Sequence, residues 1–192
     1  MECLDKNILR NLNINKRLNM TFKEKEEKDI KIYDKLISLN SIKTYDFILS
    51  YVSVKFEVDT LRFIKFCLKN NKKIYLPVCD KEKKELKFYS IDSINDLHLT
   101  NFSLLEPLQK EEKRCVFRKN FKYICITPAI AYNFYGYRIG YGKGFYDRFF
   151  SKHDCLKIGL CYDFNLEKSS FNEKFDVAVD FVLTENKILK IT

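Results

Sequence analysis

Residues 127–150 read TPAIAYNFYGYRIGYGKGFYDRFF and hold four of the five glycines of this 192-residue chain. Glycines gathered in one short stretch of a glycine-poor chain predict backbone that turns sharply or approaches another group closely. After Gly144, aromatic residues recur at spacings of three and four, which predicts a helix. A glycine loop that leads into a helix leaves free backbone N–H groups at the positive end of the helix dipole, as a phosphate site requires.

The common phosphate-binding motifs do not fit this loop. Gly142 and Lys143 are followed by Gly144 instead of the Ser or Thr of a P-loop. The dinucleotide pattern G-x-G-x-x-G, started at Gly140, requires glycine where the chain has Phe145, and the kinase glycine loop fails at the same residue. The loop therefore has the composition of a phosphate site without belonging to these families.

Length and composition predict one soluble globular domain spanning residues 1–192. Hydrophobic residues make up 46% of the chain and charged residues 32%, which is typical of a protein with a substantial core. No apolar run is long enough to span a membrane, and the first ten residues are charged throughout, unlike a signal peptide. We therefore expect no membrane partner and a cytoplasmic location.

The cysteines and histidines give no metal-binding pattern. The seven cysteines are scattered with no C-x-x-C pair, and the chain has only two histidines. This composition disfavours a zinc site and predicts reduced thiols that mostly fill core positions.

The chain carries a net charge of +9, from 35 basic and 26 acidic residues. Both signs alternate within runs such as 23–31 and 80–87, which predicts solvated faces. The excess of positive charge fits either a lysine-rich surface or a field that favours small polyanionic ligands. No recognised nucleic-acid motif accompanies it, so we expect no nucleic-acid partner.

Strands alternate with helices along the whole length. The patterns predict helices at 5–19, from the capping box at Thr21 to about residue 39, and at 60–70 with Asp59 or Thr60 as the cap. They predict strands at 47–54, 72–78 (ended by Pro77), 86–91, 121–127, 156–162 and 176–183, with 121–127 central and Gly159 closely packed. This alternation predicts an α/β fold with a largely parallel sheet.

RIGYGKGFYDRF, at residues 138–149, closely resembles the signature of the 5-formyltetrahydrofolate cyclo-ligase (methenyltetrahydrofolate synthetase) family, roughly R-[LI]-G-x-G-[KG]-G-[YF]-Y-D. The resemblance extends from Lys6 to about Glu185. It includes the opening DKNILR at 5–10, EVDT at 57–60, an LEP turn at 105–107, and Asp176 and Asp180 near the C-terminus. The chain departs from the family at Phe56, where the family has Gly, and at Asn133, where it often has Asp. Asn makes similar turn hydrogen bonds.

The resemblance implies a three-layer α/β/α sandwich with a Rossmann-like sheet of the CoA-transferase-like kind. It also implies ATP- and Mg²⁺-dependent cyclisation of 5-formyltetrahydrofolate to 5,10-methenyltetrahydrofolate, with folate and ATP as small-molecule partners. Its catalytic residues would be Arg138, Tyr141 and Lys143. ATP would be bound by Lys6, Arg10, Arg138, Gly140, Gly142, Lys143, Gly144, Phe145 and Tyr146. The folate would contact Val54, Glu57, Tyr141, Gly142, Lys143, Gly144 and Phe145, and the metal would be held by Asp147 and Asp176.

The residues also have plainer explanations. Lys143 and Asp147 are four apart at a helix start, where a surface ion pair would account for them. That pair does not account for the alternating glycines or for Arg138, which together supply the donors, cations and carboxylate of phosphoryl transfer. Two other hypotheses remain: a catalytically altered folate-binding family member, and a basic RNA-associated α/β protein. The sequence does not determine the oligomeric state, and we expect a monomer.

Overall fold

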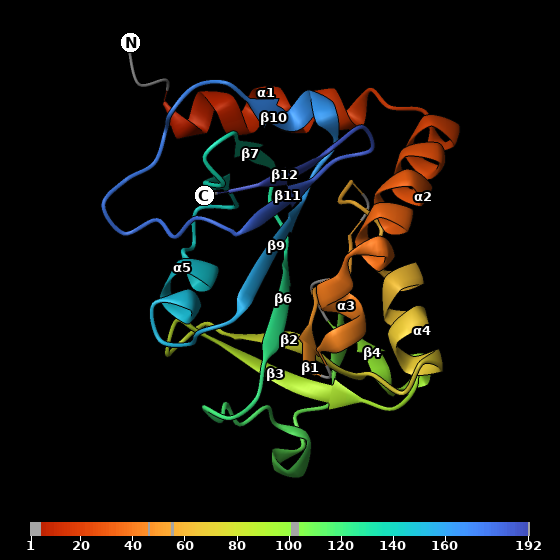
Figure 1. The fold of residues 1–192 in the computed structure, drawn as a ribbon. Coiled ribbons are helices and arrows are strands. Elements are labelled where there is room, and N and C mark those ends of the chain that lie inside the picture. The colour runs from red at the N-terminus through yellow and green to blue at the C-terminus, as the bar shows by residue number, and fades with distance from the viewer. Residues whose placement is uncertain (1–4, 46, 55, 101–103, 192) are drawn as a thin grey trace.

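The computed structural model describes residues 5–45, 47–54, 56–100 and 104–191 (Figure 1). Its centre is a seven-stranded sheet with the strand order β12-β11-β9-β6-β1-β2-β3. The strands are β1 (Phe47–Leu49), β2 (Lys73–Asp80), β3 (Glu85–Ile91), β6 (Tyr123–Thr127), β9 (Leu156–Leu160), β11 (Phe181–Leu183) and β12 (Ile188–Lys190). The five inner strands are parallel, and β3 and β12 pair antiparallel at the edges. The prediction of a largely parallel sheet with 121–127 at its centre is confirmed.

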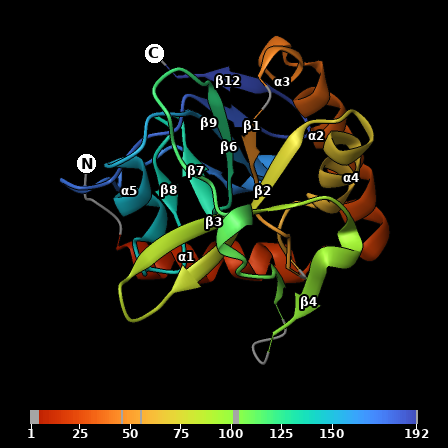
Figure 2. The same ribbon diagram turned by 90° about the horizontal axis from the view of Figure 1, so that it is seen from below.

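Helices cover one face of this sheet, and a mixed layer covers the other (Figure 2). The first layer contains α2 (Phe22–Ser38), α3 (Asn40–Thr44) and α4 (Leu61–Lys69), with Ile32, Leu36, Phe63 and Ile64 buried against the strands. The second contains the six-residue helix α5 (Phe145–Phe150) and a small sheet of β10 (Leu166–Glu167), β7 (Ala131–Asn133) and β8 (Arg138–Ile139). The α/β class is confirmed, and the second layer is built largely from the small sheet.

The remaining helix, α1 (Lys6–Leu18), crosses the carboxyl ends of the parallel strands (Figure 1). Asp5 caps it, because its carboxylate accepts a hydrogen bond of 2.7 Å from the N–H of Asn7. Ligands of open α/β sheets bind at this edge. The placement of α1 therefore brings its side chains to the loops that are expected to carry function.

The predicted helix starts are confirmed in detail. Thr21 and Glu24 form the reciprocal capping box, with side-chain-to-backbone distances of 3.2 and 2.8 Å. At α4 the carboxylate of Asp59 accepts from the N–H groups of the first two helical residues. The hydroxyl of Thr60 instead donates to the carbonyl of Tyr51. Thr60 therefore occupies the N-cap position of α4, whereas Asp59 supplies the capping hydrogen bonds.

The strand predicted at 47–54 is too long, because β1 ends at Leu49. Beyond it, the side chain of Thr60 bonds to the backbone of Tyr51 and Ser53 and folds the chain into a loop. Val54 and Glu57 therefore lie in a loop.

The expectation that Pro77 ends its strand is also wrong. Tyr75 directs its carbonyl to Ser50 on the β1 side, and Pro77, two residues further on, faces the same side. Because β1 pairs with β2 only as far as Tyr75, that side has no partner strand opposite Pro77, and the missing N–H is tolerated there.

Other strand boundaries shift by a few residues. The strand predicted at 176–183 begins at Phe181, so Asp176 lies in a preceding turn. Residues 105–107, predicted as a turn, form β5 (Leu105–Pro107), which pairs with β4 (Leu97–Leu99). Short 3₁₀ turns occupy η1 (Ile94–Asp96), η2 (Glu111–Lys113) and η3 (Asp163–Asn165). Close packing at Gly159 is confirmed, because a Cβ there would lie 2.4 Å from the ring of Tyr132.

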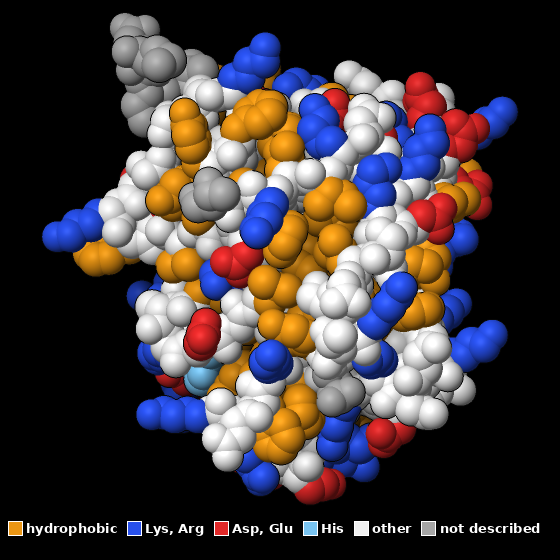
Figure 3. Space-filling view, viewed as in Figure 1, with side chains coloured by type: hydrophobic (Ala, Val, Ile, Leu, Met, Phe, Trp, Pro, Cys, Tyr) orange, Lys and Arg blue, Asp and Glu red, His pale blue; other side chains and the backbone are white. Residues whose placement is uncertain are grey.

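Three compositional features can be compared with the described residues. No helix among them is both long and apolar enough to cross a membrane. The six described cysteines are free thiols, and four of them are buried. On the face shown in Figure 3, basic side chains are dispersed over several elements instead of forming one continuous stripe.

Candidate active site

Helix α1 presents a row of long polar side chains to the carboxyl edge of the sheet. Lys6, Arg10, Asn13 and Arg17 are spaced by four, three and four residues, so they share one face of the helix. Each of the three basic residues contacts a different loop at this edge. A single helix therefore contacts three loops, each of which lies more than a hundred residues further along the chain.

Lys6 lies beside two acids of the loop before β11. Its ammonium is 2.7 Å from Asp176 and 3.1 Å from Glu173. Burial acts to lower the pKa of Lys6, but the hydrogen bonds to these two carboxylates outweigh it and raise the pKa. The predicted phosphate ligand and the predicted metal ligand thus neutralise each other in the protein without substrate.

Arg10 contacts the glycine loop directly. Its Nε donates to the carbonyl of Gly140 at 2.8 Å, and a Cβ at Gly142 would lie 3.5 Å from the guanidinium. Gly142 and Gly144 have φ angles of +81° and +64°, which favour glycine and let the loop turn sharply into α5. The structure therefore brings Arg10 and the loop together, and their binding of ATP stays a prediction.

The loop offers donors to a ligand. Within the described parts of the chain, the backbone N–H groups of residues 141–144 donate no hydrogen bond. Lys143 is exposed, and its ammonium forms no ion pair with any described residue. Free backbone donors beside an unpaired cation are the arrangement that binds phosphate groups.

Arg138 and Asp147 pair with each other beneath this loop. Their side chains are 2.7 Å apart, and Arg138 is only 8% exposed. Its second terminal nitrogen donates to the carbonyl of Val177 at 2.8 Å, and its guanidinium lies 5.2 Å from the ring centre of Phe150. In this structure Arg138 joins β8, α5 and the loop before β11. Its predicted contact with ATP stays a prediction.

The two predicted metal ligands lie in adjacent segments. Oδ1 of Asp147 accepts the N–H of Val177, the residue that follows Asp176, at 3.0 Å. Oδ2 of Asp147 has no hydrogen-bond partner among the described residues. No group of three or more His, Cys, Asp or Glu side chains suited to a metal is found in the described ranges. Two carboxylates nevertheless fit Mg²⁺, which commonly takes one or two protein carboxylates and completes its shell with phosphate and water.

Glu57 occupies the loop that follows β1. It is 8% exposed, and its carboxylate accepts the N–H of Val54 at 3.1 Å. Burial raises the pKa of Glu57, whereas the hydrogen bond from Val54 and the nearby charge of Arg17 lower it. The pKa of Tyr141, another predicted folate ligand, is raised by desolvation and then by the charge of Glu57.

Sequence reasoning missed the network centred on Arg17. The guanidinium donates to the carbonyls of Ala129 and Ile130 at 2.7 Å each and to Asn165 at 2.8 Å. It also donates to the carbonyl of Phe56 at 3.4 Å, next to Glu57. The position of Arg17 on the same helical face as Lys6 and Arg10 is a signal that could have identified it.

The two departures from the family pattern are accommodated without strain. Among the described non-glycine residues, only Asn71 and Lys84 have a positive φ. Phe56, which replaces the family's glycine, therefore does not need the backbone conformation that favours glycine. Oδ1 of Asn133 accepts the N–H groups of Tyr135 and Tyr137 at 3.0 Å each, so its predicted turn hydrogen bonds are confirmed.

A cavity of about 620 Å³ lies elsewhere, against β3 and the chain that follows α5. None of its lining residues belongs to the glycine loop or to α1. The free donors and charges at the carboxyl edge of the sheet, and not this cavity, therefore mark the candidate active site.

Comparisons with known proteins agree with this site. The family model described as the 5-formyltetrahydrofolate cyclo-ligase family matches residues 4–185. The 5-formyltetrahydrofolate cyclo-ligase of Mycoplasma genitalium is 32% identical over 196 residues, covering 94% of this chain and 98% of its own. That of Escherichia coli is 29% identical over 136 residues, covering 69% and 74%. The solved structure of Aquifex aeolicus 5,10-methenyltetrahydrofolate synthetase superposes with a TM-score of 0.83 at 28% identity, covering 97% of this chain and 92% of that one.

The fold and site place the chain in a class of α/β ligases with a glycine loop at the carboxyl edge of the sheet. The chain belongs to the 5-formyltetrahydrofolate cyclo-ligase family. The resemblance of residues 138–149 to that family is thereby confirmed, and so is the prediction of an enzyme of this class. The roles of individual site residues stay predictions.

Proposed function

We propose that this protein catalyses the ATP- and magnesium-dependent cyclisation of 5-formyltetrahydrofolate to 5,10-methenyltetrahydrofolate, releasing ADP and phosphate. The observation that supports this most strongly is the glycine loop. Its N–H groups at residues 141–144 and the ammonium of Lys143 have no partner in the described ranges, and Arg10 contacts the same loop. Such a site suits phosphoryl transfer, in which the protein positions and neutralises charge.

The chemistry needs ATP because a formamide oxygen is a poor leaving group. The formyl oxygen attacks the γ-phosphorus of ATP, which forms a C–O–P linkage and releases ADP. N10 of the folate then attacks the activated carbon, the C–O bond breaks, and phosphate leaves with its electron pair while the N10 proton passes to water. Lys143, Lys6 and Arg10 would bind the triphosphate, and the loop amides would hold the phosphate in transfer.

The carboxylates would serve the metal and the folate. Asp147 and Asp176 would hold Mg²⁺, which supplies charge neutralisation between the phosphates when bound. Triphosphate binding would draw Lys6 away from Asp176, freeing that carboxylate for the metal. Glu57, whose buried carboxylate already accepts the N–H of Val54, would accept further hydrogen bonds from the N–H groups of the pterin, and Tyr141 would lie over the same ligand.

An absorbance assay for the methenyl product tests the proposal. Purified protein with 5-formyltetrahydrofolate should form this chromophore only when ATP and Mg²⁺ are both present. Omitting either one, or adding a chelator in excess of the metal, should stop its formation.

Two other outcomes would lead to different conclusions. Saturable folate binding by calorimetry without turnover would support the catalytically altered family member. Neither binding nor turnover would contradict the folate assignment and make the basic RNA-associated protein worth testing through the salt dependence of RNA binding.

A further inference from the structure

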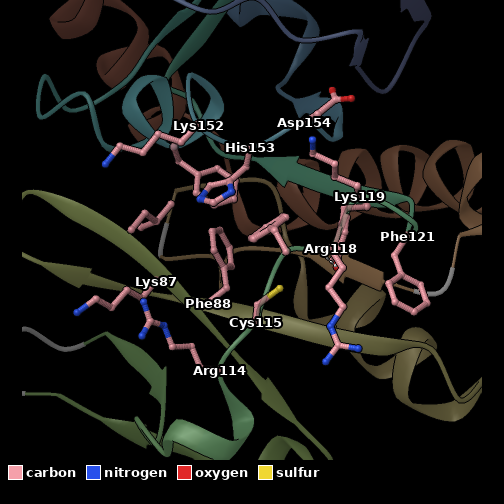
Figure 4. A pocket seen from close by; sticks show the side chains of 14 residues that line it. Lys87, Phe88, Arg114, Cys115, Arg118, Lys119, Phe121, Lys152, His153 and Asp154 are labelled. Carbon is pink, nitrogen blue, oxygen red and sulfur yellow. Dashed lines mark hydrogen bonds between the residues drawn. The ribbon is translucent and has the colours of Figure 1, made fainter.

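A second group of cations surrounds the cavity of about 620 Å³ (Figure 4). The cavity lies between β3, the segment 114–123 and the residues that follow α5, on the face of the sheet away from α2 and α4. Its basic lining residues are Lys87, Arg114, Arg118, Lys119 and Lys152, and its single acidic one is Asp154. Its volume is within the range of small-ligand sites.

The floor of the cavity is aromatic. Phe117 stacks on His153 with ring centres 4.2 Å apart, and it packs edge-on against Phe149 at 5.5 Å. Phe88 packs on Phe149 at 4.9 Å. Burial lowers the pKa of His153, and the charge of Lys152 lowers it further, so at neutral pH the imidazole contributes a flat surface and no charge. The floor can therefore stack against a planar ring.

Three of the five cations already have acidic partners outside the cavity. Lys87 pairs with Asp80, Arg114 with Glu111, and Lys152 with Glu85, at 2.9 to 3.0 Å. The pairs of Arg114 and Lys152 are exposed and that of Lys87 is half-buried, and all three offset much of the charge of these cations.

Arg118 and Lys119 differ from them. Both are exposed, and neither forms an ion pair within the ranges that the structure describes. Figure 4 shows them on one side of Phe88 and Cys115, with Arg114 on the other. Uncompensated positive charge is thus concentrated at one end of the aromatic floor.

We propose that this cavity binds a phosphorylated aromatic compound of mononucleotide size. The planar ring stacks on the half-buried Phe117 and His153, and the phosphate binds at the end of the floor where Arg118 and Lys119 lie. A planar guanidinium and a flexible ammonium together satisfy the oxygens of a phosphate. An aliphatic polyanion would leave the floor in water, and a neutral ring would leave both cations uncompensated. The inference does not rest on the proposed cyclo-ligase reaction, because the cavity shares no residue with the candidate active site.

Titration of the ¹⁵N-labelled full chain with AMP, followed by the shifts of backbone amides, tests this proposal. AMP should shift amides at 114–119 and 152–155. It should bind at least about tenfold more tightly than adenosine, which lacks the phosphate, or ribose 5-phosphate, which lacks the aromatic ring. Amides at 140–144 report binding at the candidate active site separately. Shifts confined to 140–144, or none up to millimolar AMP, would overturn the proposal.

Substitutions that reverse the charge of lining residues test where the phosphate of AMP binds. Arg118→Glu with Lys119→Glu should weaken AMP binding by about tenfold or more, because two attractive charges become repulsive. Lys31→Glu with Lys65→Glu changes the net charge equally at exposed positions of α2 and α4, on the other face, and should leave affinity unchanged. Asp154→Asn should strengthen binding by removing the one carboxylate of the lining. Equal weakening in both double variants would show a response to net charge and overturn the assignment to this cavity.

Discussion

Arg17 and Lys143 are both basic residues at the carboxyl edge of the sheet, but the fold uses their charges in opposite ways. Arg17 is 3% exposed, and its guanidinium donates to the carbonyls of Ala129 and Ile130 and to the side chain of Asn165. Lys143 is exposed, and its ammonium has no ion-pair partner in the ranges described. One charge is satisfied by the protein, and the other is available to a ligand.

This difference separates stability from activity. Removing a buried cation leaves its acceptors unpaired in a dry environment, which costs stability whether or not substrate is present. Removing an exposed, unpaired cation costs the fold almost nothing but removes a group that can stabilise developing charge. Substitutions at the two positions should therefore affect different measurements.

Lys143→Ala should have the largest effect. We expect turnover to fall by about 100-fold to 1,000-fold, as happens when one group that stabilises the transition state is lost. The free energy of unfolding in urea should change by less than about 0.5 kcal/mol. The methenyl absorbance assay measures the first quantity and denaturant titration the second. Lys83→Ala, at an exposed position in the turn between β2 and β3, is the matched control. Near-normal turnover of the Lys143 variant would show that the phosphate site lies elsewhere.

The part of the site that the sequence predicted is local. The glycines of 140–144 and the helix after them are specified by neighbouring residues, and Lys6 and Arg10 share a helical face because they are four apart. Backbone turns and helix faces depend on short spacings, which a sequence displays directly.

The part that was missed depends on partners distant in the chain. Arg17 bonds to residues 112 and 148 positions away, and its place on the helical face that it shares with Lys6 does not indicate which residues these are. The ion pair between the buried Arg138 and Asp147 was not predicted either, and the metal-binding role of Asp147 stays a prediction. The end of β1 at Leu49 likewise follows from hydrogen bonds that Thr60 makes across the loop. Tertiary contacts decide these features.

Arg17→Met should have the next largest effect, and it should be on stability. We expect the free energy of unfolding to fall by about 2–3 kcal/mol, because hydrogen bonds from a charged donor to buried carbonyls are lost. Lys16→Met, at the adjacent position with a half-exposed side chain, should cost less than about 1 kcal/mol. Urea unfolding at neutral pH makes the comparison. An equal loss in both variants would mean that α1 is weakened generally and that Arg17 has no special anchoring role.

Glu57→Gln should have the smallest of the three main effects, and it should be a gain in stability. Glu57 lies between the two regions, beside Arg17 and near Tyr141. Burial raises its pKa above the ordinary value of 4.5, so the ionised carboxylate is disfavoured in the folded protein. Between the ordinary and the raised pKa the folded state binds more protons than the unfolded state, and stability therefore falls as pH rises through this window.

Glutamine carries no charge and can still accept the N–H of Val54, so it avoids the cost that the carboxylate incurs above its raised pKa. We expect a gain of less than about 1 kcal/mol at pH 7, the size of one hydrogen-bond contribution. The gain should disappear below the ordinary pKa of glutamate, where Glu57 and the glutamine that replaces it are both neutral.

Urea unfolding across this pH range measures the gain in stability, with folate affinity by calorimetry as the second readout. A more stable variant that binds folate poorly would show that Glu57 is kept charged for its ligand at the expense of the fold. Lower stability at neutral pH would instead mean that Arg17 more than compensates the buried carboxylate, which would make Glu57 part of the anchoring network and not of the site.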